Sequence, residues 1–180
     1  MPPEPPEIRP AAAADLDAIN DIYNHYVLHS TCTYQEDPST AAQRAAWFAA
    51  HGARHPVTVA IDGGAIVGWA SLSPFHARCA YRLTVENSVY VHPDHHRRGI
   101  GRALLRDLLD RAILLGHRQI VAVISADQLP SLALHRALGF RDAGLLRGVG
   151  FKFGRWLDVA YLQKSCGTTP STGESEGAIL

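Results

Sequence analysis

The stretch Val89–Leu105, VYVHPDHHRRGIGRALL, decides the fold of this chain. Its first three residues favour a β-strand, and Pro93-Asp94 ends that strand. A basic turn follows, and Gly99 and Gly101 then lead into a helix with regularly spaced apolar residues. The glycines leave the N–H groups of the turn open to a ligand, and the helix start adds unpaired amides and a positive dipole end. This pattern predicts an anion site of the kind that binds pyrophosphates.

Two familiar phosphate-binding motifs do not fit this turn. A P-loop would continue with Gly-Lys-Ser or Gly-Lys-Thr, which does not follow here. A dinucleotide fingerprint, GxGxxG, would need glycine at the position of Leu104. The turn therefore belongs to another class of anion site, or it is an ordinary strand-to-helix turn with a basic surface.

Composition limits the class of protein. The chain has 180 residues, of which 47% are hydrophobic, and this fits one α/β domain with a complete core. Basic and acidic residues number 17 each, so the net charge is zero, and neither nucleic acid nor a membrane is expected as a partner. The basic cluster at 95–106 has no aromatic residues to stack on bases, so it suits a polyphosphate better than a nucleic acid.

The cysteines and the first residues indicate the compartment. Cys32, Cys79 and Cys166 are odd in number, far apart and without a CxxC pair, which is typical of reduced cytoplasmic thiols. No apolar run approaches the ~20 residues of a membrane span. The opening MPPEPPE lacks the apolar stretch of a signal peptide. We therefore expect a cytoplasmic protein.

Three histidines, His92, His95 and His96, lie close together in the turn. Turn histidines face solvent more often than they bind a metal, and no complete ligand set is recognisable around them. We expect no metal.

Alternating periodicities predict a single domain over residues 7–163. The proline-rich residues 1–6 and the Ser/Gly/Thr-rich residues 164–180 are expected to lack fixed structure. Strands are predicted at 7–10, 57–61, 65–73, 83–92, 120–124, 145–152 and 156–162, and helices from 15, from 40, up to 116 and at 131–138. The order is β α α β β β α β α β β, and the apolar run 120–124 is expected to be a central strand.

The turn resembles the coenzyme A pyrophosphate loop of the GNAT superfamily of N-acyltransferases, R/Q-x-x-G-x-G/A after a strand. One departure is that His96 occupies the Arg/Gln position. Four blocks, IYNHYVLHSTCTYQEDP, YRLTVENSVYVHPDHHRRGIGRALL, LALHRALGF and GFKFGRWLDV, are similar to the phosphinothricin N-acetyltransferase subfamily. The resemblance implies the GNAT fold, a mixed α/β central sheet with splayed strands flanked by helices. It also implies acetyl-CoA as co-substrate, a small-molecule amine as acceptor and a homodimer formed through the later strands.

The chemistry requires a base, an oxyanion site and a proton for the leaving thiolate. An α-amine with a pKa of about 8 must lose a proton before it attacks a thioester. Glu86 matches the family's general base, and a sheltered place in the sheet should raise its pKa; otherwise it is a solvated strand carboxylate. Backbone amides of Val89–Val91 can stabilise the oxyanion. His135 stands where many family members carry a tyrosine acid; otherwise it packs on its neighbours.

The same resemblance assigns binding residues. The cofactor set is Val89, Tyr90, Val91, Arg97, Arg98, Gly99, Ile100, Gly101, Arg102 and Gln128, the last standing where relatives often have asparagine. The acceptor set is Asn24, Tyr34, Arg78, Tyr81, Arg82 and Thr84. Arginine in this set suits a carboxylate or phosphinate through paired hydrogen bonds.

Three functions remain open at this point. The first is acetyl transfer to the α-amine of an amino-acid-like acceptor such as phosphinothricin or methionine sulfoximine. The second is acetylation of a protein N-terminus or another small amine. A peptide acceptor needs an open cleft, whereas the LHSTCTYQEDP segment looks suited to close over a small amine. The third is a non-catalytic acetyl-CoA-binding domain, which the presence of both Glu86 and His135 disfavours.

Overall fold

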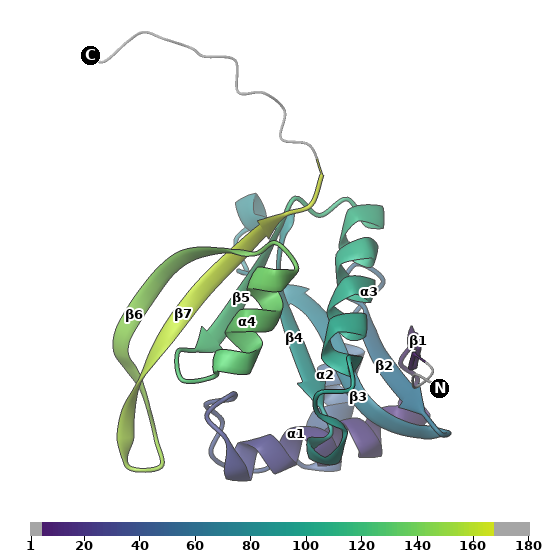
Figure 1. The fold of residues 1–180 in the computed structure, drawn as a ribbon. Helices are drawn as coiled ribbons and strands as arrows, with labels where there is room; N and C mark the ends of the chain where they lie inside the picture. Colours follow the sequence, from purple (N-terminus) through teal and green to yellow (C-terminus); the bar gives the residue numbers. More distant parts are fainter. Residues whose placement is uncertain (1–4, 168–180) are drawn as a thin grey trace, which may run out of the picture.

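The computed structural model describes residues 5–167 and contains a seven-stranded mixed sheet in the order β1-β2-β3-β4-β5-β7-β6 (Figure 1). The strands are β1 Glu7–Pro10, β2 Val57–Asp62, β3 Ala65–Pro74, β4 Thr84–Val91, β5 Gln119–Ser125, β6 Arg141–Lys152 and β7 Arg155–Ser165. The helices are α1 Leu16–His29, α2 Ala41–Ala49, α3 Ile100–Leu114 and α4 Leu129–Ala137. Apart from short 3₁₀ turns, this is the order predicted from the sequence.

The C-terminal hairpin is longer than predicted. Pairing of Arg141 with Gln163 and of Ser165 with Gln119 extends both β6 and β7. Lys164 and Ser165, which the sequence placed in a tail without fixed structure, therefore belong to the sheet. Cys166 is also held, since its amide donates to the Arg118 carbonyl at 2.9 Å. Residues 1–4 and 168–180 of the expected tails lie outside the described residues.

Residues that are close in the sequence define two helix ends. The Thr40 hydroxyl accepts a hydrogen bond from the Gln43 amide at 3.2 Å, and the Gln43 side chain accepts one from the Thr40 amide at 2.8 Å, which completes a capping box. Gly139, at φ +87°, ends α4 in the left-handed conformation that glycine adopts without strain.

The central strands β4 and β5 splay apart. They are parallel neighbours, but they pair only from Thr84–Glu86 to Gln119–Val121. β4 stays paired with β3 as far as Val91, whereas β5 stays paired with β7 as far as Ser125. Because each strand follows its other neighbour, the two strands diverge beyond Glu86 (Figure 1). Residues of both strands line a cleft between them. The splayed central sheet expected from the resemblance is confirmed.

The two faces of the sheet carry different helices. Leu104, Leu105 and Leu108 of α3 are buried in one core with strand residues of β3 to β5 and part of α4. On the opposite face, Ile19 and Ile22 of α1 pack with Trp69 and other residues of β2 and β3. Within residues 5–167, no helix is both long and apolar enough to cross a bilayer.

Candidate active site

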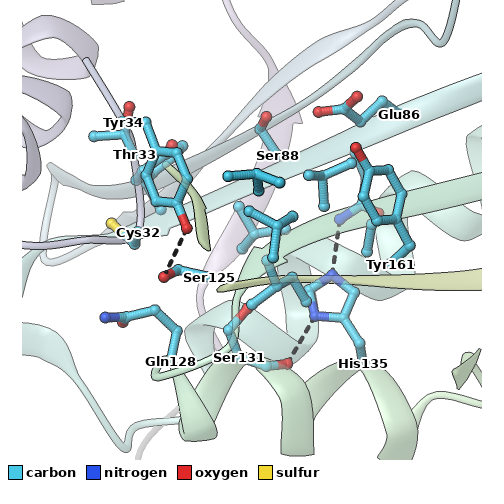
Figure 2. A pocket seen from close by; sticks show the side chains of 18 residues that line it. Cys32, Thr33, Tyr34, Glu86, Ser88, Ser125, Gln128, Ser131, His135 and Tyr161 are labelled. Atoms are coloured by element: carbon cyan, nitrogen blue, oxygen red, sulfur yellow. Dashed lines mark hydrogen bonds between the residues drawn. The ribbon is translucent and has the colours of Figure 1, made fainter. Parts of the chain in front are cut away.

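A cavity of about 420 Å³ lies in the cleft between β4 and β5 (Figure 2). Its walls come from both strands, the start of α4, the C-terminal hairpin and the segment 32–34 that follows α1. Six of the residues expected from the sequence line it: Tyr34, Glu86, Val89, Tyr90, Gln128 and His135. The splay thus brings together residues that are up to about a hundred positions apart in the chain.

Glu86 is half-buried on β4 where the cleft opens. Burial raises the pKa of its carboxyl group, in the direction expected from the sequence. Within residues 5–167 its carboxylate accepts no hydrogen bond from another residue, so its oxygens are free to take a proton. A carboxylate with a raised pKa and an unused acceptor is suited to general base catalysis.

The β4 backbone offers hydrogen-bond donors beside Glu86. The His92 amide donates to the Val67 carbonyl at 2.8 Å, and the Val91 carbonyl accepts from the Tyr26 hydroxyl. Because bonding direction alternates along an antiparallel strand, the even-numbered residues of β4 bond to β3 and the odd-numbered ones face the cleft. Val89 and Val91 therefore present their amides as expected. Tyr90 does not, because its backbone faces β3, and it contributes only its side chain to the cavity.

His135 does not have the environment of a proton donor. It is 3% exposed, and burial lowers its pKa, which favours the neutral ring. The Asn87 amide donates to Nε2 at 2.9 Å, and Nδ1 lies 2.8 Å from the Ser131 carbonyl, so Nδ1 carries the proton (Figure 2). Both ring nitrogens therefore make hydrogen bonds within the cavity wall. The acid role expected from the sequence is not favoured, because the nitrogen bonded to Asn87 has no proton to give.

The α1–α2 connection forms one wall of the cavity. The ammonium group of Lys152, 2% exposed, donates to the carbonyls of Ser30 at 2.9 Å and Thr33 at 2.8 Å. The Tyr34 hydroxyl lies 3.1 Å from the Ser125 hydroxyl (Figure 2). The Tyr34 ring lies against bare backbone at Gly150, where an added Cβ would come within 2.3 Å of the ring. These contacts fix the connection to the C-terminal hairpin.

Asn24 supports this wall but does not line the cavity. Its amide donates to the Ser39 carbonyl at 2.9 Å, and its oxygen accepts from the Ser39 amide at 2.8 Å. Because both ends of the side chain are used, the acceptor contact expected of Asn24 is replaced by a role in holding the connection.

The predicted anion turn is a cradle of backbone amides. Gly99 has φ +81° and Arg97 has φ +60°, which curls the chain ahead of α3. In the described part of the chain, the amides of residues 97–102 donate no hydrogen bond, and the first amide that does is that of Ala103, to the Gly99 carbonyl at 3.0 Å. Six unpaired amides at the start of a long helix suit a pyrophosphate.

Most side chains of this turn point elsewhere. The Arg98 guanidinium lies 2.8 Å from the Asp62 carboxylate, and Ile100 is buried in the core. Arg97 and Arg102 are exposed at the turn. His96, the departure from the family pattern, has its Nε2 2.6 Å from the Tyr26 hydroxyl. The cradle therefore depends on backbone geometry, which explains why a histidine is accommodated there.

Like Asn24, four further residues of the expected acceptor set do not line this cavity. Arg78, Tyr81 and Arg82 are exposed on the β3–β4 connection, and Tyr81 packs against Phe75. Thr84 is half-buried at the start of β4 and pairs with Gln119. Arg82 makes one weak contact, 3.5 Å from Nη1 to the Cys79 carbonyl.

The sequence reasoning missed several residues that line the cavity, including Cys32, Thr33, Asn87, Ser88, Ser125, Ser131 and Tyr161. Figure 2 shows the Tyr161 hydroxyl and the Glu86 carboxylate toward the same end of the cavity. Ser88 had a signal in the sequence, because it shares the strand face of Glu86 at i+2. Ser125 and Tyr161 had none, since only the pairing of β5 with β7 brings them to the cleft.

Within the described residues, no group of three or more His, Cys, Asp or Glu side chains is placed to hold a metal ion. The rings of His92 and His95 pack edge to face, and Nδ1 of His95 also lies 2.8 Å from the Arg98 guanidinium.

Comparison with known proteins gives consistent matches. The sequence pattern of the acetyltransferase (GNAT) family matches residues 19–140. An L-amino acid N-acyltransferase of Escherichia coli is 43% identical over 157 residues, which cover 87% of this chain and 91% of that protein. An L-methionine sulfoximine/L-methionine sulfone acetyltransferase of Salmonella typhimurium is 41% identical, with 87% and 92% covered. The crystal structure of a GNAT superfamily phosphinothricin acetyltransferase of Sinorhizobium meliloti in complex with AcCoA superposes with a TM-score of 0.89 at 44% identity, covering 96% of this chain and 97% of that one.

Proposed function

The chain belongs to the GNAT family of acetyltransferases, and on that premise we propose that it moves an acetyl group from acetyl-CoA to the α-amine of a small amino-acid-like acceptor. Acceptors of the methionine sulfoximine and phosphinothricin type are favoured, because these compounds appear in the names of relatives that match nearly the whole domain. The observation that carries the proposal is the place of Glu86 in the cavity between β4 and β5, on the strand whose free amides precede the amide cradle in the chain.

Acetyl-CoA fits the residues of the cleft. The pyrophosphate would lie on the amides of residues 97–102, and Gly101 keeps that helix start close to Val91 and Leu134, 3.5 and 3.4 Å from where a Cβ would stand. The pantetheine arm would follow the cleft-facing backbone of β4. Gln128 can reach it from the cavity wall, although its amide nitrogen already donates to Thr31 at 2.8 Å.

The reaction then needs few groups. Glu86, directly or through a water, takes a proton from the acceptor ammonium, and the free amine attacks the thioester carbon. The amides of Val89 and Val91 stabilise the oxyanion while the new C–N bond forms. The C–S bond breaks, and the coenzyme A thiolate takes up the second proton that the attacking nitrogen loses. We assign His135 a positioning role, because it holds Asn87 in the cavity wall.

A turnover panel tests the proposal. With acetyl-CoA as donor, release of the coenzyme A thiol should be faster with methionine sulfoximine or phosphinothricin than with a peptide N-terminus or a polyamine. Faster turnover of the peptide or the polyamine would contradict the acceptor class. Binding of acetyl-CoA with no thiol release from any amine would support the non-catalytic alternative.

We also propose a homodimer. The exposed side of the C-terminal hairpin carries several large apolar residues, each 44–69% exposed: Leu145, Leu146, Val149, Phe151 and Trp156. Val149 also lines the cavity, so a partner on this surface would border the active site. Light scattering during gel filtration should give twice the chain mass, and Trp156→Lys should reduce it. A wild-type monomer at micromolar concentration would contradict the dimer.

The cytoplasm is the compartment we propose, since all three cysteines are free.

A further inference from the structure

A second cavity, of about 410 Å³, adjoins the first on the face of the sheet that α1 and α2 cover. Ser88 and Tyr90 line both cavities. Ser73 and Ser71, which also line the second, are the register partners of Glu86 and Ser88. Because side chains of paired residues lie on the same face, the second cavity begins directly beside the proposed base.

A buried arginine faces this cavity without a counterion. Arg44 of α2 is 4% exposed, and its Nε donates to the Asn20 side chain at 3.1 Å. Its guanidinium carbon lies 4.4 Å from the ring centre of Tyr23 and 4.6 Å from that of Trp47. In residues 5–167, its two terminal nitrogens donate no hydrogen bond and no carboxylate oxygen lies within 4.0 Å of them. A buried charge without an ionic partner is costly unless a ligand completes the site.

The other polar groups of the cavity are also donors. The indole N–H of Trp69 is buried and has no hydrogen-bond partner among the described residues, and it can only donate. Ser71, 1% exposed, adds a hydroxyl. Among residues 5–167, no aspartate or glutamate lines the cavity. The cavity thus combines a guanidinium fixed by aromatic rings, an indole N–H without a partner and hydroxyl groups, with no carboxylate among the described lining residues. This set of donors suits a compact anion.

We propose that Arg44 binds the α-carboxylate of the acceptor and thereby selects free amino acids over amines that lack this group. The inference rests on the proposed function. An amino acid carries its amine and carboxylate on one carbon, so an amine beside Glu86 places the carboxylate in the space bordered by Ser73 and Ser88. The aromatic rings of Tyr23 and Trp47 hold the guanidinium in place, which lowers the entropy lost on binding. The exposed Arg78 and Arg82 lie outside both cavities.

The test compares one pair of acceptors across variants. L-Methionine sulfone and its carboxamide differ only in the carboxylate, and the distal sulfone is neutral. Relative to the wild type, Arg44→Met should lower the ratio of kcat/KM for the acid to kcat/KM for the amide by about 10- to 100-fold. Since every variant meets the same pair, the difference in amine basicity cancels. Arg54→Met, an exposed arginine just after α2, is the matched control and should keep the ratio.

Folding is checked separately. Acetyl-CoA affinity and melting temperature report whether Arg44→Met is intact, and Arg44→Lys, which keeps the charge without the paired donors, should give an intermediate ratio if the Met variant does not fold.

An unchanged ratio in a folded Arg44 variant would overturn the inference and leave the proposed function standing. The same would follow if Arg82→Met, and not Arg44→Met, abolished the ratio. Selective loss of phosphinothricin turnover with an unchanged acid-to-amide ratio would place the distal anion, not the α-carboxylate, at Arg44. Failure of the wild type to acetylate any amino acid would refute the proposed function, and the inference with it.

Discussion

The proposed pyrophosphate site is built from six consecutive residues, whereas the proposed acceptor site is built from side chains of three separate parts of the chain. The cradle at 97–102 offers backbone amides, so its side chains are free to pair elsewhere, as Arg98 does with Asp62. The acceptor end depends on Glu86 of β4, Arg44 of α2 and Tyr34 of the α1–α2 connection. A backbone site tolerates changes of side chain but not the loss of a glycine, and a side-chain site has the opposite sensitivity.

The largest effect is expected from Glu86→Gln at the acceptor end. Acetyl transfer at neutral pH should fall by roughly 10²–10⁴-fold while acetyl-CoA binding is kept. The loss should shrink at high pH, where solvent already deprotonates the amine, so the measurement is kcat/KM against pH. A variant as fast as the wild type at pH 7 would show that another group is the base.

The same variant should gain stability. Because burial raises the pKa of Glu86, the folded wild type loses stability as pH rises from the unfolded carboxyl value, ~4.3, through the raised folded value. Glutamine has no charge to bury, so the melting temperature of Glu86→Gln at pH 7 should be equal to or above that of the wild type.

The cradle is tested by Gly99→Val. An added side chain would occupy the open space at the turn where the ligand is expected, and φ +81° is strained for valine. At about 100-fold excess over its Kd, acetyl-CoA should stabilise the wild type by about 2.7 kcal/mol, and the variant should lose most of this shift. Gly154→Val, with φ +73° and nothing within 4 Å, carries similar strain far from the cradle and should keep it. Equal ligand shifts in both variants would show that the amides do not hold the cofactor.

A smaller effect is expected from Gly150→Ala. The added Cβ would lie 2.3 Å from the Tyr34 ring and displace it, so kcat/KM for the acceptor should fall about tenfold and stability by about 1–3 kcal/mol. Gly144→Ala, on the same strand with nothing within 4 Å, is the control. Similar melting temperatures and rates in the two alanine variants would show that the Tyr34 ring can move without affecting stability or acceptor turnover.

The smallest effect on rate is expected from His135→Gln. A neutral histidine that holds Asn87 is not a proton donor, so kcat should fall less than about tenfold and its pH profile should keep its shape. A loss of 10²-fold with a vanished limb of the pH profile would restore the acid role.

Stability gives a second test of His135. Because burial lowers its pKa, its contribution is fully present above the unfolded value of about 6.5 and is lost as pH falls toward the folded value. Thermal denaturation at pH 8 and at pH 5.5 should therefore show a smaller acid-dependent decrease for His135→Gln than for the wild type.

Local chemistry determined much of this protein. The order of elements, the capping box at Thr40, the end of α4 at Gly139 and the anion turn all depend on residues within a few positions of one another, so they could be predicted from the sequence. The central place of β5 also followed from its unbroken apolar run. The role of Glu86 came from a family resemblance, and burial in the structure raises its pKa in the direction that role requires.

Tertiary structure decided the rest, because it depends on which distant groups share a partner. The residues that neighbour Asn24 in the sequence do not show that the backbone of Ser39 would bond to both ends of its side-chain amide. Those that neighbour His135 do not show that Asn87 and Ser131 would bond to its two ring nitrogens. The register of β4 against β3 turns the backbone amide of Tyr90 away from the cleft, and helix packing buries Arg44 with no counterion among residues 5–167. Hydrogen-bond partners and burial are properties of the assembled fold, so the local sequence determines the turn that offers amides, and only the folded chain determines which side chains meet the acceptor.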